Sequence, residues 1–249
     1  MLDSVLLLLA TISGAVAHGY VQEIVTSGGT YSGFLPWSDP YYPVTPERIV
    51  RKIPGNYPIE DLTLIDIQCN GKIDWGQVGS APAPIFGLAE AGTNVALNWT
   101  EWPDSHAGPI ITYMARSPID ITKWQPELDP VWFKVDESGL VNGTKWAATD
   151  ILKANKSIYT FKIPEWLQPG QYIVRHEIIA LHGAFNYPGV QVYPSCIQLQ
   201  ITGSGTKIPP ASAMVAFPGA YTPDTPGIVY NMYGGNTTYP IPGPAIWTP

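Results

Sequence analysis

Short runs of apolar and β-branched residues, separated by turn-forming residues, recur along most of the chain. Many of the runs are rich in Val, Ile, Thr and aromatic residues, and several are bounded by Gly, Pro, Asn or Asp, which is typical of β-strands. We expect strands at Tyr20–Val25, Leu64–Cys69, Asn94–Trp99, Ile110–Ala115, Trp132–Val135, Ser157–Lys162, Gln171–Ala180 and Ile197–Thr202. This pattern predicts an all-β fold, a two-sheet β-sandwich of the immunoglobulin or fibronectin type.

Two long segments lack this strand pattern. Ser27 to Asp61 is irregular and rich in aromatic residues, and the chain from about 203 to 249 is rich in Pro, Gly and Tyr. Long loops within one compact domain are usually functional or mobile. We expect residues 18–249 to form a single catalytic domain without an appended carbohydrate-binding module.

The first 17 residues form an apolar stretch that closes on Ala15-Val16-Ala17, a small-x-small signal peptidase site. Residues 1–17 are therefore predicted to be a secretory signal peptide, and His18 the first residue of a secreted chain. An N-terminal histidine can chelate one metal ion through its α-amine and its ring Nδ1. Alternatively, His18 stands at this position by chance and has no chemical role.

Composition narrows the class of protein further. The formal net charge is −7 and only 13% of residues are charged, which argues against a nucleic-acid partner. No apolar run of membrane-spanning length follows residue 17, so no membrane partner is expected.

Export also affects how the cysteines and the asparagines are interpreted. Cys69 and Cys196 are the two cysteines, and in an exported chain they are expected to form a disulfide, the alternative being two buried free thiols. Four Asn-x-Ser/Thr sequons are candidates for glycosylation: Asn98, Asn142, Asn155 and Asn236.

Histidines are the main candidates for chemistry, and there are four of them. His106 lies in a turn-rich loop just before a predicted strand, where it could reach a site on the sandwich rim or be an ordinary exposed side chain. His176 and His182 are six residues apart, so the metalloprotease pattern H-E-x-x-H is absent. His176 is expected to be a buried, hydrogen-bonded histidine, whereas His182 at the strand end is better placed for a role at the rim.

Gln191 and Tyr193 are two residues apart, so in a strand they would face the same side. They could form hydrogen bonds in the core or serve as outer ligands of a metal. Their spacing does not decide between these interpretations.

Taken together, these segments resemble the fungal lytic polysaccharide monooxygenases of auxiliary activity family 9, formerly glycoside hydrolase family 61. The similarity covers essentially the whole mature chain in order. It is carried by Ala17-His18-Gly19-Tyr20-Val21, Trp102 to Pro109 with Tyr113, Trp132 to Val135, Arg175 to His182, Gln191 to Cys196, and Phe217 to Tyr221.

The resemblance implies a β-sandwich with a flat face centred on one copper ion. His18 would bind copper through its amine and Nδ1 and His106 through Nε2, a histidine brace, with Tyr193 at the axial position. Nitrogen ligands of this kind suit Cu(II). His182 and Gln191 would form the outer shell that hydrogen-bonds the oxygen species, so His182, Gln191 and Tyr193 are the predicted catalytic residues.

The resemblance also implies the reaction. Copper cycling between Cu(II) and Cu(I), with an external electron donor and dioxygen or hydrogen peroxide, would oxidise C1 or C4 of a β-1,4-glucan such as cellulose. The protein would act as a monomer. Tyr221, Tyr31 and Trp37 are candidates to stack on sugar rings, with loop packing as the alternative.

Two features depart from the family's usual pattern. The chain has cysteines for one disulfide where many members have two, and Ala107 stands where a larger polar residue is frequent. We expect the first to lower stability and the second to alter contacts beside the copper.

Two rival functions use different chemistry. A glycoside hydrolase needs two carboxylates about 5–10 Å apart across the bond. Glu101, Asp104 and Glu177 are candidates, but no pair stands out. A non-catalytic secreted copper- or sugar-binding sandwich would bind its ligand and yield no oxidised sugar.

Overall fold

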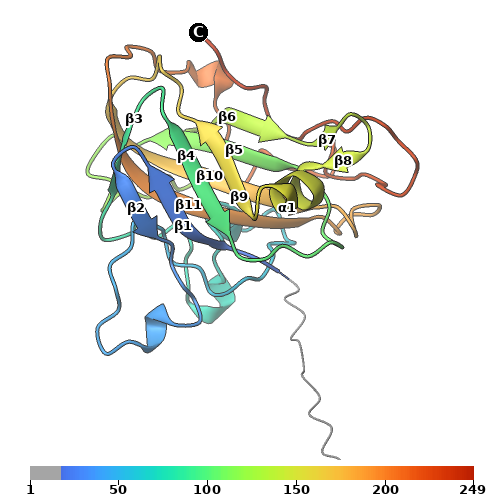
Figure 1. The fold of residues 1–249 in the computed structure, drawn as a ribbon, viewed down its shortest axis with the longest axis horizontal. Coiled ribbons are helices and arrows are strands. Elements are labelled where there is room, and N and C mark those ends of the chain that lie inside the picture. Colours follow the sequence, from blue (N-terminus) through green and yellow to red (C-terminus); the bar gives the residue numbers. More distant parts are fainter. Residues whose placement is uncertain (1–17) are drawn as a thin grey trace, which may run out of the picture.

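The computed structural model describes residues 18–249. Its main elements are two β-sheets in which most neighbouring strands are antiparallel (Figure 1). The predicted signal peptide lies outside the described residues. The first sheet has the order β2 (Gly29–Ser32), β1 (Val21–Thr26), β4 (Asn94–Trp99), β9 (Ile158–Lys162). The second has the order β3 (Gly87–Glu90), β11 (Gln191–Thr202), β10 (Gly170–Ala180), β5 (Ile110–Arg116), β6 (Phe133–Ser138). The predicted β-sandwich is confirmed.

Small elements occupy the loops between these strands. A two-stranded hairpin joins β7 (Leu140–Val141) and β8 (Lys145–Trp146). Four short 3-10 helices are η1 (Asp39–Tyr41), η2 (Ile65–Ile67), η3 (Ile73–Trp75) and η5 (Ala211–Ala213). The π-helix η4 (Ala147–Ile151) continues into α1 (Leu152–Ala154).

Burial along the strands shows how the layers pack. In β4 every second residue is buried, as expected of a strand with one face in the core: Val95, Leu97 and Trp99 point inward. By contrast, β10 and β11 are buried on nearly every residue. One of their faces packs in the sandwich core, and loops with the C-terminal segment cover the other with a second apolar cluster.

Seven of the eight expected strands correspond to observed strands; Asn94–Trp99 has the predicted bounds, and the other six have shifted ends. The strand predicted over Leu64–Cys69 is wrong: the chain turns through η2 there. Asp66 explains the difference, because its carboxylate accepts the backbone N–H of Ile73 at 3.1 Å and its backbone oxygen accepts that of Asn70 at 2.9 Å. Short β3 and β2 escaped prediction because Gly and exposed positions interrupt their apolar pattern.

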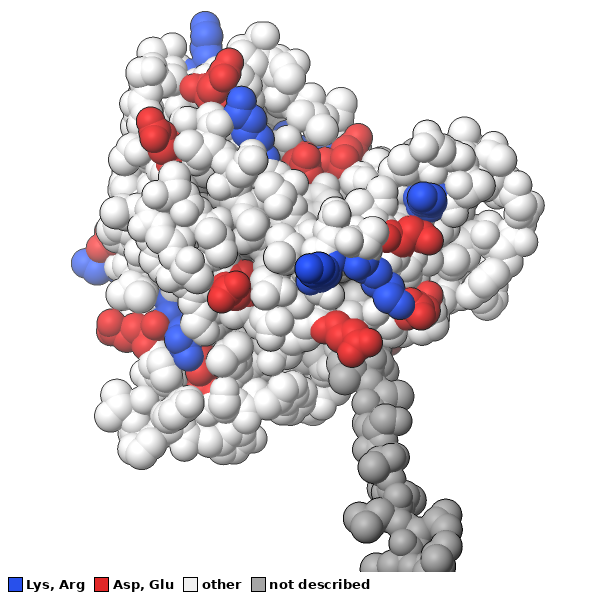
Figure 2. Space-filling view, in the orientation of Figure 1, with Lys and Arg blue, Asp and Glu red and all other residues white. Residues whose placement is uncertain are grey.

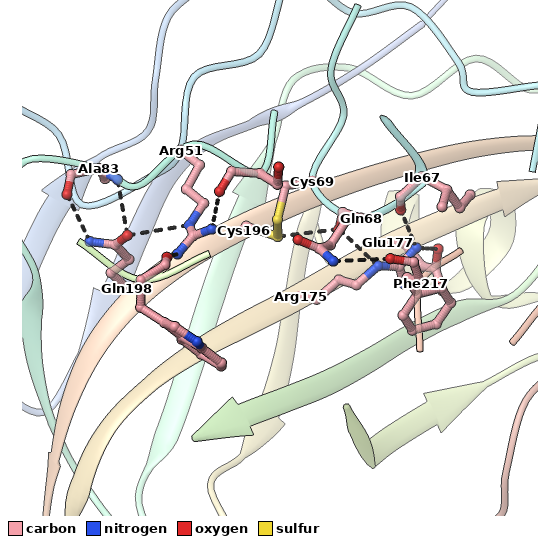
Figure 3. The surroundings of a disulfide bond; sticks show 12 residues. Arg51, Ile67, Gln68, Cys69, Ala83, Arg175, Glu177, Cys196, Gln198 and Phe217 are labelled. Atoms are coloured by element: carbon pink, nitrogen blue, oxygen red, sulfur yellow. Dashed lines mark hydrogen bonds and ion pairs between the residues drawn. A yellow bond between two sulfur atoms is a disulfide. The ribbon is translucent and has the colours of Figure 1, made fainter. Parts of the chain in front are cut away.

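The disulfide joins Cys69 of this turn to Cys196 of β11, as expected, so the free-thiol alternative is wrong. Figure 3 shows Arg175 reaching the same turn, where its guanidinium donates to the backbone oxygens of Ile67 at 2.8 Å and Gln68 at 2.9 Å. Arg175 also pairs with buried Glu177 at 2.7 Å. The disulfide and the hydrogen bonds from Arg175 therefore fix the turn against the second sheet.

Strand ends at one end of the sandwich carry the predicted site residues. Ile110 at the start of β5 pairs with Ile178 near the end of β10. Ala180 at the end of β10 in turn pairs with Gln191 at the start of β11. In the other sheet Val21, just after His18, pairs with Trp99 at the end of β4. The pairing thus gathers segments far apart in the sequence at one rim.

Charge is sparse on the molecular surface. Figure 2 shows scattered charged side chains and a white lobe at the lower left, where Figure 1 places the loop that carries η1. Within residues 18–249 no helix is long and apolar enough to cross a membrane. Asn142, Asn155 and Asn236 are exposed, whereas Asn98 lies half-buried within β4, between β1 and β9.

Candidate metal centre

His18, His106 and Tyr193 converge at this rim. The ring centroids of His18 and His106 are 5.2 Å apart, and the phenol ring of Tyr193 lies 5.6 Å from His18 and 6.2 Å from His106. The three residues come from the chain before β1, the loop between β4 and β5, and β11. The structure therefore brings together the three side chains that the sequence marked as metal ligands.

His18 is held through its backbone and its neighbour. Asn56 donates its side-chain N–H to the backbone oxygen of His18 at 3.0 Å. Gly19 follows, and a Cβ there would lie only 3.0 Å from the ring of Trp102. A residue without a side chain at position 19 lets the chain pass closely over Trp102. The buried ring of Trp102 thereby supports the backbone next to His18.

His106 is fixed by a tight turn. Its backbone N–H donates to the Pro103 oxygen at 3.1 Å, and its backbone oxygen accepts the indole N–H of Trp102 at 2.9 Å. Its ring Nδ1 lies 2.9 Å from Ser105 Oγ. The other ring nitrogen, Nε2, is buried and has no hydrogen-bond partner among residues 18–249. A buried polar atom without a partner is uncommon and calls for a ligand or another explanation.

The surroundings keep both imidazoles neutral. Burial, followed by the charge of His182 and then that of His18, lowers the pKa of His106 to about 4, although a contact with the Gln191 side chain opposes this shift. Burial and then His182 also lower the pKa of His18, although Glu60 opposes this. A neutral imidazole has a free nitrogen lone pair, which is the form that binds metals.

Tyr193 is almost fully buried, and its ring packs edge-on at 5.0 Å from that of Trp102. Its hydroxyl donates to Gln191 Oε1 at 2.8 Å, so the two side chains share one side of β11, as their spacing predicts. Burial, with Glu60 as a second cause, raises the pKa of the phenol. Tyr193 is therefore a neutral phenol at ordinary pH.

His182 stacks closely on His106, with ring centroids 4.2 Å apart. Its Nδ1 is buried and has no hydrogen-bond partner within the described part of the chain. Burial lowers its pKa, and Glu60 opposes the shift. His182 thus lies beside His106 and Gln191 beside Tyr193, and their role in an outer shell stays a prediction. His176, in contrast, lies within β10 and is fully buried, so the prediction of a structural histidine is confirmed.

Two of the three predicted sugar-stacking residues are wrong. Tyr221 is 3% exposed, and its hydroxyl bonds to Tyr113 and Glu177 inside the second apolar cluster, so it cannot reach a polysaccharide. Tyr31 accepts the backbone N–H of Leu88 at 2.9 Å and packs against the sandwich core. It pairs with Ile24, about 20 Å along β1 from His18 at the usual strand rise. The loop-packing alternative applies to both.

Trp37 remains a candidate, since it is 53% exposed. Its ring stands edge-on to that of Tyr57 at 6.2 Å, and Tyr57 stands edge-on to Trp75 at 6.1 Å. Sequence reasoning missed Tyr57 and Trp75 as a continuation of Trp37. Asn56, the neighbour of Tyr57, contacts His18, so this row of exposed rings is linked to the centre.

Ala107 is buried in the second apolar cluster, and its backbone oxygen accepts the N–H of Leu181 at 2.9 Å. Its small side chain therefore packs inward, and the effect of this residue on contacts beside the copper stays a prediction.

Two of the three carboxylates considered for hydrolysis are engaged in ion pairs. Glu177 is fully buried in its ion pair with Arg175. Asp104 pairs with Lys153 of α1, and Glu101 is exposed. Among residues 18–249, no three His, Cys, Asp or Glu side chains gather as a metal site. A metal at the rim would accordingly need nitrogen from the main chain beside the two imidazoles.

Comparison with known proteins agrees with this geometry. The family Auxiliary Activity family 9 (formerly GH61) matches residues 18–239. An AA9 family lytic polysaccharide monooxygenase A from Gloeophyllum trabeum is 55% identical, the match covering 99% of this chain and 77% of the relative. An AA9 family lytic polysaccharide monooxygenase B from Malbranchea cinnamomea is 55% identical, over 95% of this chain and 94% of the relative.

Solved structures are similar as well. The extended catalytic domain of H. jecorina LPMO9A superposes with a TM-score of 0.82 at 31% identity, covering 92% of this chain and 90% of that one. A cellulose-active polysaccharide monooxygenase from M. thermophila gives a TM-score of 0.76 at 30% identity, covering 92% and 99%.

Proposed function

The chain belongs to Auxiliary Activity family 9, the lytic polysaccharide monooxygenases, and on this premise we propose that His18, His106 and Tyr193 form the copper site at which it cleaves β-1,4-glucan. The observation that carries the proposal is the buried, unpartnered Nε2 of His106 beside His18 and Tyr193. The family is copper-dependent, and the donor set fits that metal, because imidazole and amine nitrogens suit Cu(II).

Each ligand has a definite form. His106 would bind through Nε2, with the proton on Nδ1 donated to Ser105 Oγ; such a partner fixes the tautomer and orientation of a ligating imidazole. His18 would bind through Nδ1 and through its main-chain nitrogen, which becomes an α-amine when residues 1–17 are removed. Tyr193 would contribute its phenol oxygen as a weak, neutral ligand, because its proton is held by Gln191.

The other residues of the site would bind the oxygen cosubstrate and exclude water. Bound copper supplies one-electron redox chemistry between Cu(II) and Cu(I), with which an external electron donor and dioxygen or hydrogen peroxide oxidise C1 or C4 of the glycosidic linkage. His182 and Gln191 would offer hydrogen bonds to the oxygen cosubstrate beside the copper. The buried ring of Trp102 packs against Gly19 and Tyr193 and would exclude water from that side of the site.

We further propose the cellular and substrate setting. Enzymes of this family are extracellular, and residues 1–17 would direct this chain to export as a monomer. Its partner would be a cellulose or related β-glucan surface, across which Trp37 stacks on sugar rings. The named relatives are monooxygenases, which favours this function over a hydrolase or a non-catalytic binder.

Mass spectrometry of the sugars released from cellulose tests the proposal. Copper-loaded protein that begins at His18 should release oligosaccharides with aldonic-acid or 4-keto mass shifts only when ascorbate is added. Treatment with a copper chelator should abolish these products. Native sugars that form without reductant would contradict the proposal and point to a hydrolase.

A further inference from the structure

A chain of hydrogen bonds leads from the candidate metal centre to the protein surface. The hydroxyl of Tyr193 donates to Gln191 Oε1 at 2.8 Å, and Gln191 Nε2 donates to Glu60 Oε1 at 2.9 Å. Both ends of the Gln191 amide are therefore engaged. Glu60 lies 131 residues from Gln191 in the chain, so no local sequence pattern indicates the contact.

Main-chain pairing places Glu60 opposite Gln191. Ile59 forms an isolated antiparallel bridge with Val192, with N–O distances of 2.8 and 3.0 Å in the two directions. In an antiparallel pair the next residue along one strand faces the previous residue of the other, so Glu60 and Gln191 are cross-strand neighbours. Ile59 is itself buried, which anchors the bridge. The Glu60 carboxylate thus needs little freedom to reach the amide.

We propose that Glu60 is a positioning residue that sets the orientation of the Gln191 amide, and through it the donor role of the Tyr193 hydroxyl. An ionised carboxylate accepts hydrogen bonds and donates none, so it selects the Nε2 end of the amide. The Oε1 end is then left for Tyr193. The phenol proton is committed to Gln191, and the lone pairs of the phenol oxygen stay available for another partner.

Without Glu60 the amide has no such constraint. Besides Glu60 and Tyr193, the Gln191 side chain has His106 as a polar neighbour, and this contact raises the pKa of that histidine. Because an amide and a hydroxyl can each donate or accept, the reversed amide could donate Nε2–H to the tyrosine oxygen. That reversal would use a lone pair of the phenol oxygen. The inference rests on the proposed function only for the role of Tyr193; the contact exists in the chain without metal.

The first test uses metal-free protein, so it does not depend on the proposed function. In ¹⁵N-labelled protein the two Hε2 resonances of Gln191 should be well separated, because one proton is bonded to a carboxylate. In Glu60→Leu they should move toward the positions of a free amide. Glu60 is exposed, so the variant should fold, which the amide spectrum of the core strands reports in the same experiment.

Two matched variants separate contact from charge. Glu60→Gln keeps an oxygen that can accept from Gln191 but adds a donor that could bond the reversed amide, so its two resonances should be less separated than in the parent and more separated than in Glu60→Leu. Asp61→Asn removes the neighbouring charge; Asp61 bonds to Thr63 and not to Gln191, so it should behave like the parent. Unchanged Gln191 resonances in Glu60→Leu would overturn the proposal.

A second readout uses copper-loaded protein. The electron paramagnetic resonance spectrum of Cu(II) should shift in Glu60→Leu and less so in Glu60→Gln. Turnover should fall about threefold to tenfold in Glu60→Leu. This decrease is no larger than the roughly tenfold loss of activity at the low end for residues that hydrogen-bond metal ligands. A Cu(II) spectrum in Glu60→Leu identical to that of the parent would contradict the positioning role even if both proteins are active.

Discussion

Histidine has different chemistry at two positions of this chain because its neighbours differ. Both ring nitrogens of His176 are engaged: Nδ1 lies 2.9 Å from Thr112 Oγ1, and Nε2 accepts the indole N–H of Trp99 at 3.2 Å. His106 keeps one buried nitrogen without a partner within the described residues. A satisfied ring in a strand is structural, and an unsatisfied one in a rigid loop can bind a ligand.

The environment of His176 predicts how it responds to acid. Burial, followed by the charge of Arg175, lowers its pKa to about 3. The unfolded chain takes up the proton near pH 6.5, so this residue favours unfolding increasingly as pH falls from about 6.5 toward 3. The nitrogen chemical shifts of His176 in the folded protein should therefore show a neutral ring down to about pH 4. A titration midpoint near 6.5 would contradict this assignment.

At the scale of single residues, the sequence identified the residues proposed to form the copper site but not the residues that support them. His18, His106, His182, Gln191 and Tyr193 stand in short local motifs and could be found by resemblance. Tyr221 was misjudged because an aromatic in a Pro- and Gly-rich loop gives no sign of whether it faces solvent or core. Asn56 and Glu60 act through pairing with distant segments, which no local pattern reveals.

At the scale of elements, the hairpin of β10 and β11 organises the site. It carries Gln191 and Tyr193 on one strand and leads to His182 at the end of the other. Their long apolar runs predicted these strands, whereas the turn at η2 was predicted as a strand because Leu64, Ile65 and Ile67 form a similar apolar run. The Asp66 carboxylate accepts a hydrogen bond from the backbone of Ile73, and this bond favours a turn over a strand in this segment.

The disulfide between this turn and β11 should contribute strongly to stability. It closes a separation of 127 residues. In the chain-entropy description, replacing both cysteines by alanine should lower the free energy of unfolding by about 4–5 kcal/mol. Guanidinium unfolding of parent and variant measures the difference. A loss below about 1 kcal/mol would show that Arg175 and its carbonyl contacts hold the turn without the covalent bond.

At the scale of the whole molecule, the sandwich presents one rim as a broad face. Strand ends from both sheets supply the centre, and the long loop between β2 and β3 supplies exposed Trp37, Tyr57 and Trp75 beside it. The lobe that carries η1 shows little charge in Figure 2. An aromatic, weakly charged surface is suited to lie on a polysaccharide, whose sugar rings offer apolar faces.

Processing of the whole chain decides whether this centre can work. His106 and Tyr193 stand in the folded domain whatever precedes residue 18, but a chelating amine on His18 exists only when the chain begins there. Export and formation of the metal site are thus coupled in our account. A longer chain would fold and yet lack one nitrogen ligand.

The most direct measurement compares Cu(II) affinity, by competition with a chelator, for protein that begins at His18 and protein with one additional alanine before it. We predict that the extension weakens binding by at least about 100-fold, because the nitrogen becomes a peptide amide and the six-membered chelate ring through one residue is lost. Thermal unfolding of the metal-free proteins should agree, which excludes misfolding. Equal copper affinity in the two proteins would contradict the central claim that His18 binds the metal through its amine.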